Sequence, residues 1–125
     1  MGELSQVTEA QRAMWGAGDY VPFGEMLRPS SGRLVEAAGV AAGERVVDVA
    51  CGTGNTSLAA ARAGAEVTGV DLTPKMLEGA RAAAAGEGVT ACTFLEGDAQ
   101  ALPLPDDGFD VALSTFGCMF APDQE

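Results

Sequence analysis

The sequence predicts an α/β fold, a doubly wound parallel sheet preceded by helices, and two observations lead to it. First, short β-branched segments alternate with Ala- and Leu-rich segments from residue 45 to residue 115, the order expected when helices connect parallel strands. Second, 47% of the residues are apolar but only 6% are aromatic, and 17 are glycines, which suits close packing of helices on a sheet. A length of 125 residues allows one domain with a single core.

The first forty residues predict two helices joined by a loop. Residues 4–14 show a moderately amphipathic pattern, whereas residues 15–23 contain Gly and Pro, which interrupt regular structure. We predict a loop or lid over residues 15–23. Ser31 is a candidate N-cap for the second helix, and Gly39 stands where a helix end favours a left-handed residue.

The remainder of the chain predicts a core of alternating elements. The β-branched run after Arg45 ends in glycines, as a strand buried on both faces does. Thr73 and Pro74 have the residue types of an N-cap and a first helical position. We expect strands at residues 45–50, 66–70, 90–95 and 109–115, with helices at residues 55–63 and 73–86.

Glycines and acids follow the predicted strands at the point where each strand ends. Gly52 and Gly54 follow the first strand, Asp71 closes the second and Asp98 follows the third. Glycines let backbone N–H groups approach a ligand, and an acid at a strand end accepts ribose hydroxyls. Because the carboxyl ends of parallel strands share one edge, these residues predict a nucleoside site. Each has a plainer alternative, an ordinary βα turn for the glycines and a helix cap or solvated turn for the acids.

Four segments resemble class I S-adenosylmethionine (SAM)-dependent methyltransferases, particularly the small-molecule type related to ubiquinone and menaquinone biosynthesis. They are residues 48–54 (DVACGTG), 68–77 (TGVDLTPKML), 96–105 (EGDAQALPLP) and 109–111 (FDV). The resemblance runs from about Gly24 to the last residue. It implies a Rossmann-like sheet with strand order 3-2-1-4, SAM as cofactor and a small-molecule methyl acceptor as partner.

The resemblance also implies a role for individual residues, although none is assigned a catalytic role. The implied cofactor contacts are Asp48, Ala50, Cys51, Gly52 and Gly54 around the methionine moiety, Asp71 on the ribose, Leu72 and Met76 against the adenine, Asp98 on its amino group, Ala99 on a ring nitrogen, and Ser114 with Thr115 and Phe116 beside the sulfonium. Trp15, Tyr20 and Phe23 either cover the cofactor or only pack the N-terminal helices.

NAD is the alternative cofactor for a glycine turn of this kind. Its fingerprint places Gly or Ala where this chain has Ser57. Asp48 inside the strand also has no purpose beside an anionic pyrophosphate, whereas it suits a ligand that carries an ammonium and a sulfonium. These two residues favour SAM over NAD.

Charge and composition exclude several other classes of function. The formal net charge of -11 would repel a phosphate backbone, so we expect no nucleic-acid partner. The absence of histidine and the wide spacing of the three cysteines argue against a metal site. No signal peptide and no membrane-spanning run is apparent, which predicts a cytoplasmic protein without membrane association.

By its resemblance the complete sheet has seven strands in the order 3-2-1-4-5-7-6, so we expect this chain to hold a truncated sheet. We predict one SAM-binding domain over residues 1–125, incomplete at its C-terminus, with N-terminal helices and lid in residues 1–40 and the core in residues 41–125. The exposed fourth strand predicts a homodimer through that edge. Two functions stay open, part of a working methyltransferase or a module that binds SAM without catalysis.

Overall fold

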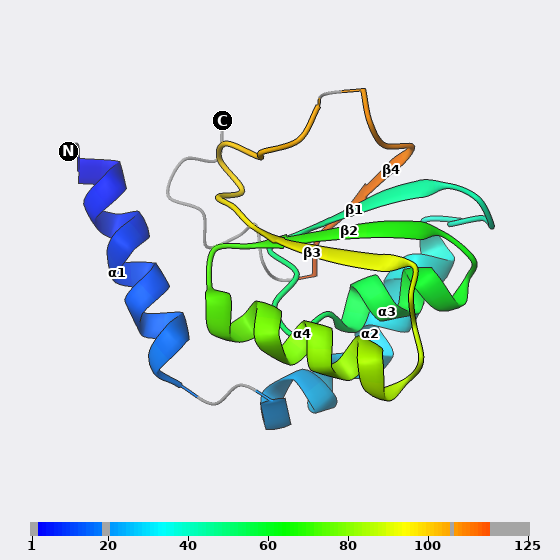
Figure 1. Cartoon of the computed structure of the whole chain (residues 1–125), viewed down its shortest axis with the longest axis horizontal. Coiled ribbons are helices and arrows are strands. Elements are labelled where there is room, and N and C mark those ends of the chain that lie inside the picture. Colours follow the sequence, from blue (N-terminus) through cyan, green and yellow to red (C-terminus); the bar gives the residue numbers. More distant parts are fainter. Residues whose placement is uncertain (1–2, 19–20, 106, 116–125) are drawn as a thin grey trace.

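The computed structural model describes residues 3–18, 21–105 and 107–115. Its elements are α1 (Glu3–Ala17), α2 (Val21–Ala37), β1 (Arg45–Val49), α3 (Asn55–Arg62), β2 (Glu66–Asp71), α4 (Pro74–Gly86), β3 (Cys92–Glu96) and β4 (Val111–Leu113) (Figure 1). All four strands are parallel, and their order is β3-β2-β1-β4. The predicted α/β class and the strand order are confirmed.

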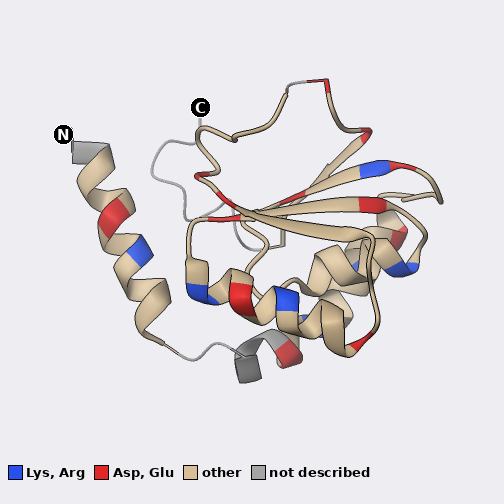
Figure 2. Ribbon diagram, viewed as in Figure 1, with Lys and Arg blue, Asp and Glu red and all other residues tan. Residues whose placement is uncertain are grey.

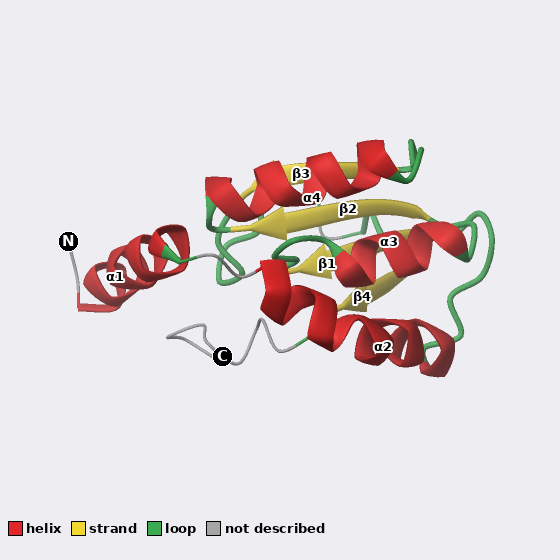
Figure 3. Ribbon diagram, turned by 90° about the horizontal axis from the view of Figure 1, so that it is seen from below, coloured by secondary structure: helices red, strands yellow, loops and turns green. Residues whose placement is uncertain are grey.

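Helices α2, α3 and α4 cover one face of the sheet (Figure 3). The opposite face is covered, among the described residues, by the segment that joins β3 to β4 rather than by a helix (Figure 1). There, Ala99, Leu104 and Phe109 pack against a buried valine cluster made of Val47, Val49 and Val70. The irregular segment therefore serves as the second layer over the part of the sheet beside the predicted site.

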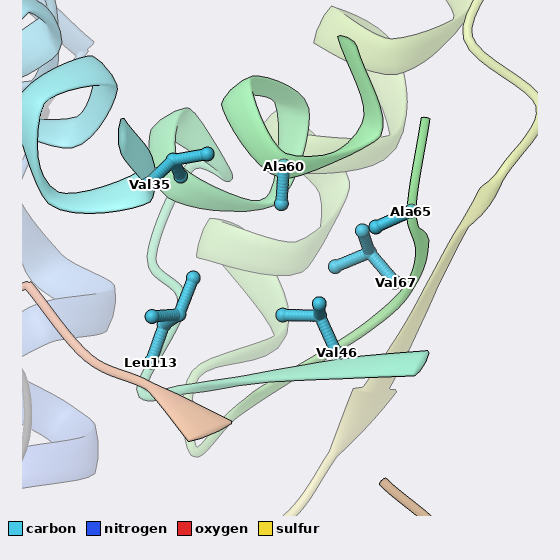
Figure 4. Packing of buried hydrophobic residues seen from close by; sticks show 6 residues of the cluster. All are labelled: Val35, Val46, Ala60, Ala65, Val67 and Leu113. Atoms are coloured by element: carbon cyan, nitrogen blue, oxygen red, sulfur yellow. The ribbon is translucent and has the colours of Figure 1, made fainter. Parts of the chain in front are cut away.

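The side chains of β1 point alternately to the helix layer and to the irregular segment on the opposite face of the sheet. Val46 and Asp48 face the helices, whereas Val47 and Val49 face the irregular segment. On the helix side, Val46 lies in a cluster with Val35, Ala60, Ala65, Val67 and Leu113 (Figure 4). The alanine at the helix surface lets α3 approach the sheet closely, which is why an Ala-rich sequence forms this layer.

The N-terminal part differs from the sequence prediction. The predicted loop at residues 15–23 is wrong at both ends, since α1 continues to Ala17 and α2 already begins at Val21. Ser31 is not a cap: it lies inside α2 with 1% of its surface exposed, and its hydroxyl accepts a hydrogen bond of 2.9 Å from Thr56. Packing of α2 on α3 has overridden the local signals of Gly and Pro. Gly39 does adopt the predicted left-handed conformation, with φ of 67°.

The fourth strand, Val111–Leu113, is shorter at both ends than the predicted residues 109–115. Just before it, the Asp110 carboxylate accepts a hydrogen bond of 2.8 Å from the Arg45 N–H, and the Asp110 N–H donates to the Arg45 carbonyl at 2.7 Å. The Arg45 guanidinium lies 5.7 Å from the centre of the Phe109 ring. These contacts join the start of β1 to the segment that leads into β4.

Gly69 in β2 is expected to tolerate no side chain. A Cβ there would lie 2.7 Å from Cδ1 of Phe94 and 3.0 Å from Sγ of Cys51. We expect Gly69→Ala to lower the free energy of unfolding by about 1–3 kcal/mol, the usual cost of overpacking. Gly86→Ala is the matched control, since a Cβ at Gly86 meets nothing within 4 Å. Urea denaturation compares the two variants, and equal stabilities would contradict this account of the packing.

Candidate cofactor site

The predicted site residues gather at the carboxyl edge of the sheet. The parallel pairing aligns Val49 with Val70 and Asp71 with Glu96, so the segments that follow β1, β2 and β3 leave the sheet side by side. This edge lies toward α1 in Figure 1. In open α/β sheets, ligands bind in the crevice outside such an edge.

The turn after β1, residues 50–54, is strained and open. Ala50 has a φ of 55°, a conformation that non-glycine residues rarely adopt. Gly54 has a φ of 87°, and a Cβ there would lie 3.2 Å from the Cβ of Ala80 in α4. At Gly52, with φ of 56°, a Cβ would meet nothing within 4 Å. The side of Gly52 on which a side chain would lie therefore faces free space, which lets a ligand approach the backbone of the turn there.

Asp71, at the end of β2, is hydrogen-bonded to this turn. One carboxylate oxygen accepts a hydrogen bond of 2.9 Å from the Gly52 N–H, and the other accepts one of 2.9 Å from the Thr73 N–H. Burial raises the pKa of Asp71, and the hydrogen bonds from Thr73 and Gly52 oppose the increase. Thr73 and Pro74 stand at the N-cap and the first turn of α4, as predicted, but the Thr73 side chain makes no cap hydrogen bond to the helix. The Thr73 side chain and the Leu72 backbone also bond to this carboxylate, so a ligand hydroxyl would join an existing set of donors.

Asp48 lies beneath the turn, with 1% of its surface exposed. Its carboxylate accepts a hydrogen bond of 2.7 Å from the Ser57 hydroxyl and another from the Ser57 backbone N–H. The N-cap residue of α3 is Gly54, which has no side chain to cap the helix. Asp48 therefore caps the first turn of α3 from the neighbouring strand. Burial raises its pKa from 3.8 to about 7, against the effect of the Ser57 hydrogen bonds.

The residues expected around the adenine lie on the segments after β2 and β3. Leu72 and Met76 are half-buried at the start of α4. The carboxylate of Asp98 accepts a hydrogen bond of 2.9 Å from the Gln100 N–H and is also contacted by the Gln100 amide at 3.1 Å. Ala99 packs against the valine cluster on the face opposite the helices. The structure thus brings these residues to the same edge as Gly52 and Asp71.

Ser114 and Thr115, which the resemblance places beside the sulfonium, follow β4 and belong to a cluster of hydroxyl groups. The Ser114 hydroxyl donates to the Val49 carbonyl at 2.8 Å. Thr115 and Thr56 share a hydrogen bond of 2.6 Å, and Thr56 also donates to Ser31. These contacts join α2, α3 and the end of β4 next to the turn. No sequence pattern indicates them, because the partners are far apart in the chain. Phe116 lies outside the described residues.

Comparison with known proteins identifies the protein family to which the chain is similar. The methyltransferase domain family matches residues 46–125, which contain β1 to β4 and the turn. The chain belongs to this family. The match covers the residues that lie around Gly52 and Asp71, and it places the chain in a SAM-dependent methyltransferase family.

Relatives and solved structures agree with this assignment. An uncharacterized protein of Mycobacterium tuberculosis is 50% identical over 124 residues, which are 98% of this chain and 45% of that protein. The crystal structure of YcgJ from Bacillus subtilis has a TM-score of 0.71 and 36% identity, covering 75% of this chain and 40% of YcgJ. An RNA methyltransferase from Salinibacter ruber, solved with S-adenosylhomocysteine (SAH), has a TM-score of 0.63 and 26% identity, covering 69% of this chain and 56% of that one. The chain thus spans less than half the length of the curated relative.

Helix α1 and Gly18, which follows it, contact the start of α4 beside the candidate site. The Arg12 Nε donates to the Leu72 carbonyl at 3.2 Å, and the Lys75 ammonium donates to the Gly18 carbonyl at 2.5 Å. Of the residues predicted to form a cover, Trp15 is half-buried on α1. Tyr20 and the side chain of Phe23 lie outside the described residues. Sequence reasoning did not find Arg12 or Lys75, since their contacts depend on how α1 docks.

Two of the three thiols, Cys51 and Cys92, are protonated near pH 7. Burial raises the pKa of Cys92 to about 11 and raises that of Cys51 further.

The described parts of the chain contain no group of three or more Cys, Asp or Glu residues arranged to hold a metal ion. They also contain no helix with the length and hydropathy needed to cross a bilayer. Acidic residues are spread over both the helices and the sheet (Figure 2).

Proposed function

We propose that this chain provides the donor site of a SAM-dependent methyltransferase that acts on a small-molecule acceptor. The observation that carries the proposal is the position of Asp71. Its carboxylate lies at the end of β2 and holds the Gly52 N–H of the turn after β1. Since Gly52 faces free space, a nucleoside that binds Asp71 through its ribose hydroxyls would lie directly over the turn.

The chain's own residues fit the parts of SAM in turn. Asp71 would accept the ribose hydroxyls, and the half-buried Leu72 and Met76 would contact the adenine ring. Asp98 and the Ala99 N–H would bind the polar edge of the adenine. When bound, SAM supplies a methyl group on a sulfonium, and this group is displaced in line with a neutral leaving group. The protein mainly has to orient the two reactants and exclude water.

A small molecule is the acceptor class that charge favours. With a net charge of -11, the chain would repel a polynucleotide at physiological ionic strength. The similarity to an RNA methyltransferase is limited to 26% identity, and acceptor choice depends on loops and added segments rather than on the shared fold. We therefore propose a small uncharged or cationic acceptor.

Calorimetric titration with SAH tests the donor site, and a methyl-transfer assay on a panel of small acceptors tests the reaction. We expect SAH to bind with a dissociation constant in the micromolar range or below. Binding together with transfer supports the enzyme, and binding without transfer supports the alternative of a non-catalytic SAM-binding module. Absence of SAH binding by a folded chain would overturn the proposed function.

We also propose that β4 pairs with a second copy of the chain. Among the described residues β4 pairs with β1 alone, and an unpaired strand edge favours association. Light scattering at micromolar concentration should give the mass of a dimer. A stable monomer would contradict this proposal.

A further inference from the structure

The carboxyl group of Asp48 is buried beneath the cofactor turn without a basic partner among the described residues. Ser57 of α3 donates two hydrogen bonds to it. The other titratable groups that act on it or feel its charge are Asp71 of β2, Cys51 of the turn and Cys92 of β3. Asp71 is a like charge, and the two thiols are neutral near pH 7.

This environment makes the ionised form of Asp48 costly. A buried carboxylate needs hydrogen bonds or an opposite charge to offset the loss of water. Ser57 provides the hydrogen bonds, but no described residue provides the charge. With a pKa of about 7, Asp48 is about half protonated at neutral pH in the free protein. A cation placed on the turn above it would supply the missing charge.

SAM and SAH differ in the charge that they bring to this place. Both carry an amino acid group, an adenine and a ribose. Only SAM carries the positive sulfonium, because SAH is the neutral thioether that remains after methyl transfer. Any group that responds to charge beside the turn therefore distinguishes the donor from the product.

We propose that Asp48 is a specificity-determining residue, which loses its proton when SAM binds and thereby favours the charged donor over the neutral product. The proton passes from the Asp48 carboxyl group to solvent, and the resulting carboxylate stabilises the sulfonium through the turn. The inference rests on the proposed function, since it requires SAM to lie over residues 50–54.

The expected effects follow from the fraction of protein in which Asp48 is ionised. SAM binding at pH 7 should release up to about half a proton per site, and SAH binding clearly less. If SAM binds only the ionised form, its affinity should be up to about tenfold weaker at pH 6 than at pH 8. The preference for SAM over SAH should therefore increase as the pH rises.

Calorimetry of SAM and SAH binding in two buffers with different ionisation enthalpies counts the protons released. We expect more release with SAM than with SAH in the wild-type chain, and no difference in Asp48→Asn. The variant also subtracts any proton that comes from the ligand itself. Asp107→Asn changes an exposed acid in the turn before β4 and should behave as the wild type.

Ser57→Ala provides a second variant if Asp48→Asn does not fold. Removal of the Ser57 hydroxyl should raise the pKa of Asp48, so the pH at which SAM affinity falls to half should move upward. Equal proton release for SAM and SAH, or an unchanged pH profile in Ser57→Ala, would overturn the inference while leaving the donor site intact. Failure of both ligands to bind would overturn the proposed function and the inference together.

Discussion

Replacement of Asp71 by asparagine is expected to weaken SAH binding by about 100-fold or more. Two charge-assisted hydrogen bonds to the ribose would be lost, each worth about 1.5–3 kcal/mol. The amide also has only one acceptor oxygen, whereas Asp71 accepts from both Gly52 and Thr73. Its NH2 group would therefore face an N–H donor, and the turn would lose its attachment to β2.

Calorimetric titration of the variant with SAH measures this loss. Asp107→Asn is the matched control, because it removes the same charge from an exposed position in the turn before β4. Circular dichroism would establish that both variants are folded. Near wild-type affinity in a folded Asp71→Asn variant would show that the carboxylate does not hold the ribose.

Replacement of Asp48 by asparagine is expected to flatten the pH dependence of stability. The pKa of Asp48 is about 7 in the folded chain, against an ordinary value of 3.8, so the folded state holds a proton that the unfolded chain has already released. Stability from this group is present at about pH 4 and is lost as the pH rises through 7. At about 1.4 kcal/mol for each pKa unit, the loss amounts to about 4 kcal/mol.

Urea denaturation of both proteins between about pH 4 and pH 8 tests this expectation. The free energy of unfolding of the wild type should fall relative to that of Asp48→Asn as the pH rises. Titration of other groups cancels in this comparison, provided that the substitution leaves them unchanged. Parallel pH profiles would mean that Asp48 is ionised at low pH, which would also remove the basis of the proposed proton release.

The two acids illustrate why similar sequence signals have different structural outcomes. Both Asp48 and Asp71 were predicted to contact the cofactor. Asp71 lies at the end of its strand and contacts the N–H of the open Gly52. Asp48 lies on the neighbouring strand β1, opposite Gly69, on the face toward the helices, where it caps α3 through Ser57. Ser57, noted in the sequence only because it departs from the NAD fingerprint, is the residue that binds the buried carboxylate.

The N-terminal segment was the least predictable part of the chain. Gly and Pro between residues 15 and 29 favour interruptions, yet α2 runs through Pro29. Burial of Ser31 and Val35 against the core stabilises that helix more than the local residues disfavour it. The hydrogen bonds from Arg12 to Leu72 and from Lys75 to Gly18 likewise depend on how α1 docks against α4, which lies about sixty residues further along the chain.

The sequence by itself determined the parallel α/β sheet, the turn after β1 and the gathering of Gly52, Asp71 and Asp98 at one edge, while the strand order was implied by the family resemblance. Strand periodicity and turn residues are local signals, and parallel crossovers then leave few arrangements of the sheet. Only the tertiary structure decided that Asp48 is buried under the turn, that Asp71 holds Gly52, and that α1 stands beside the site. Burial and the charge environment arise from contacts between distant segments, and these contacts set the protonation of each acid.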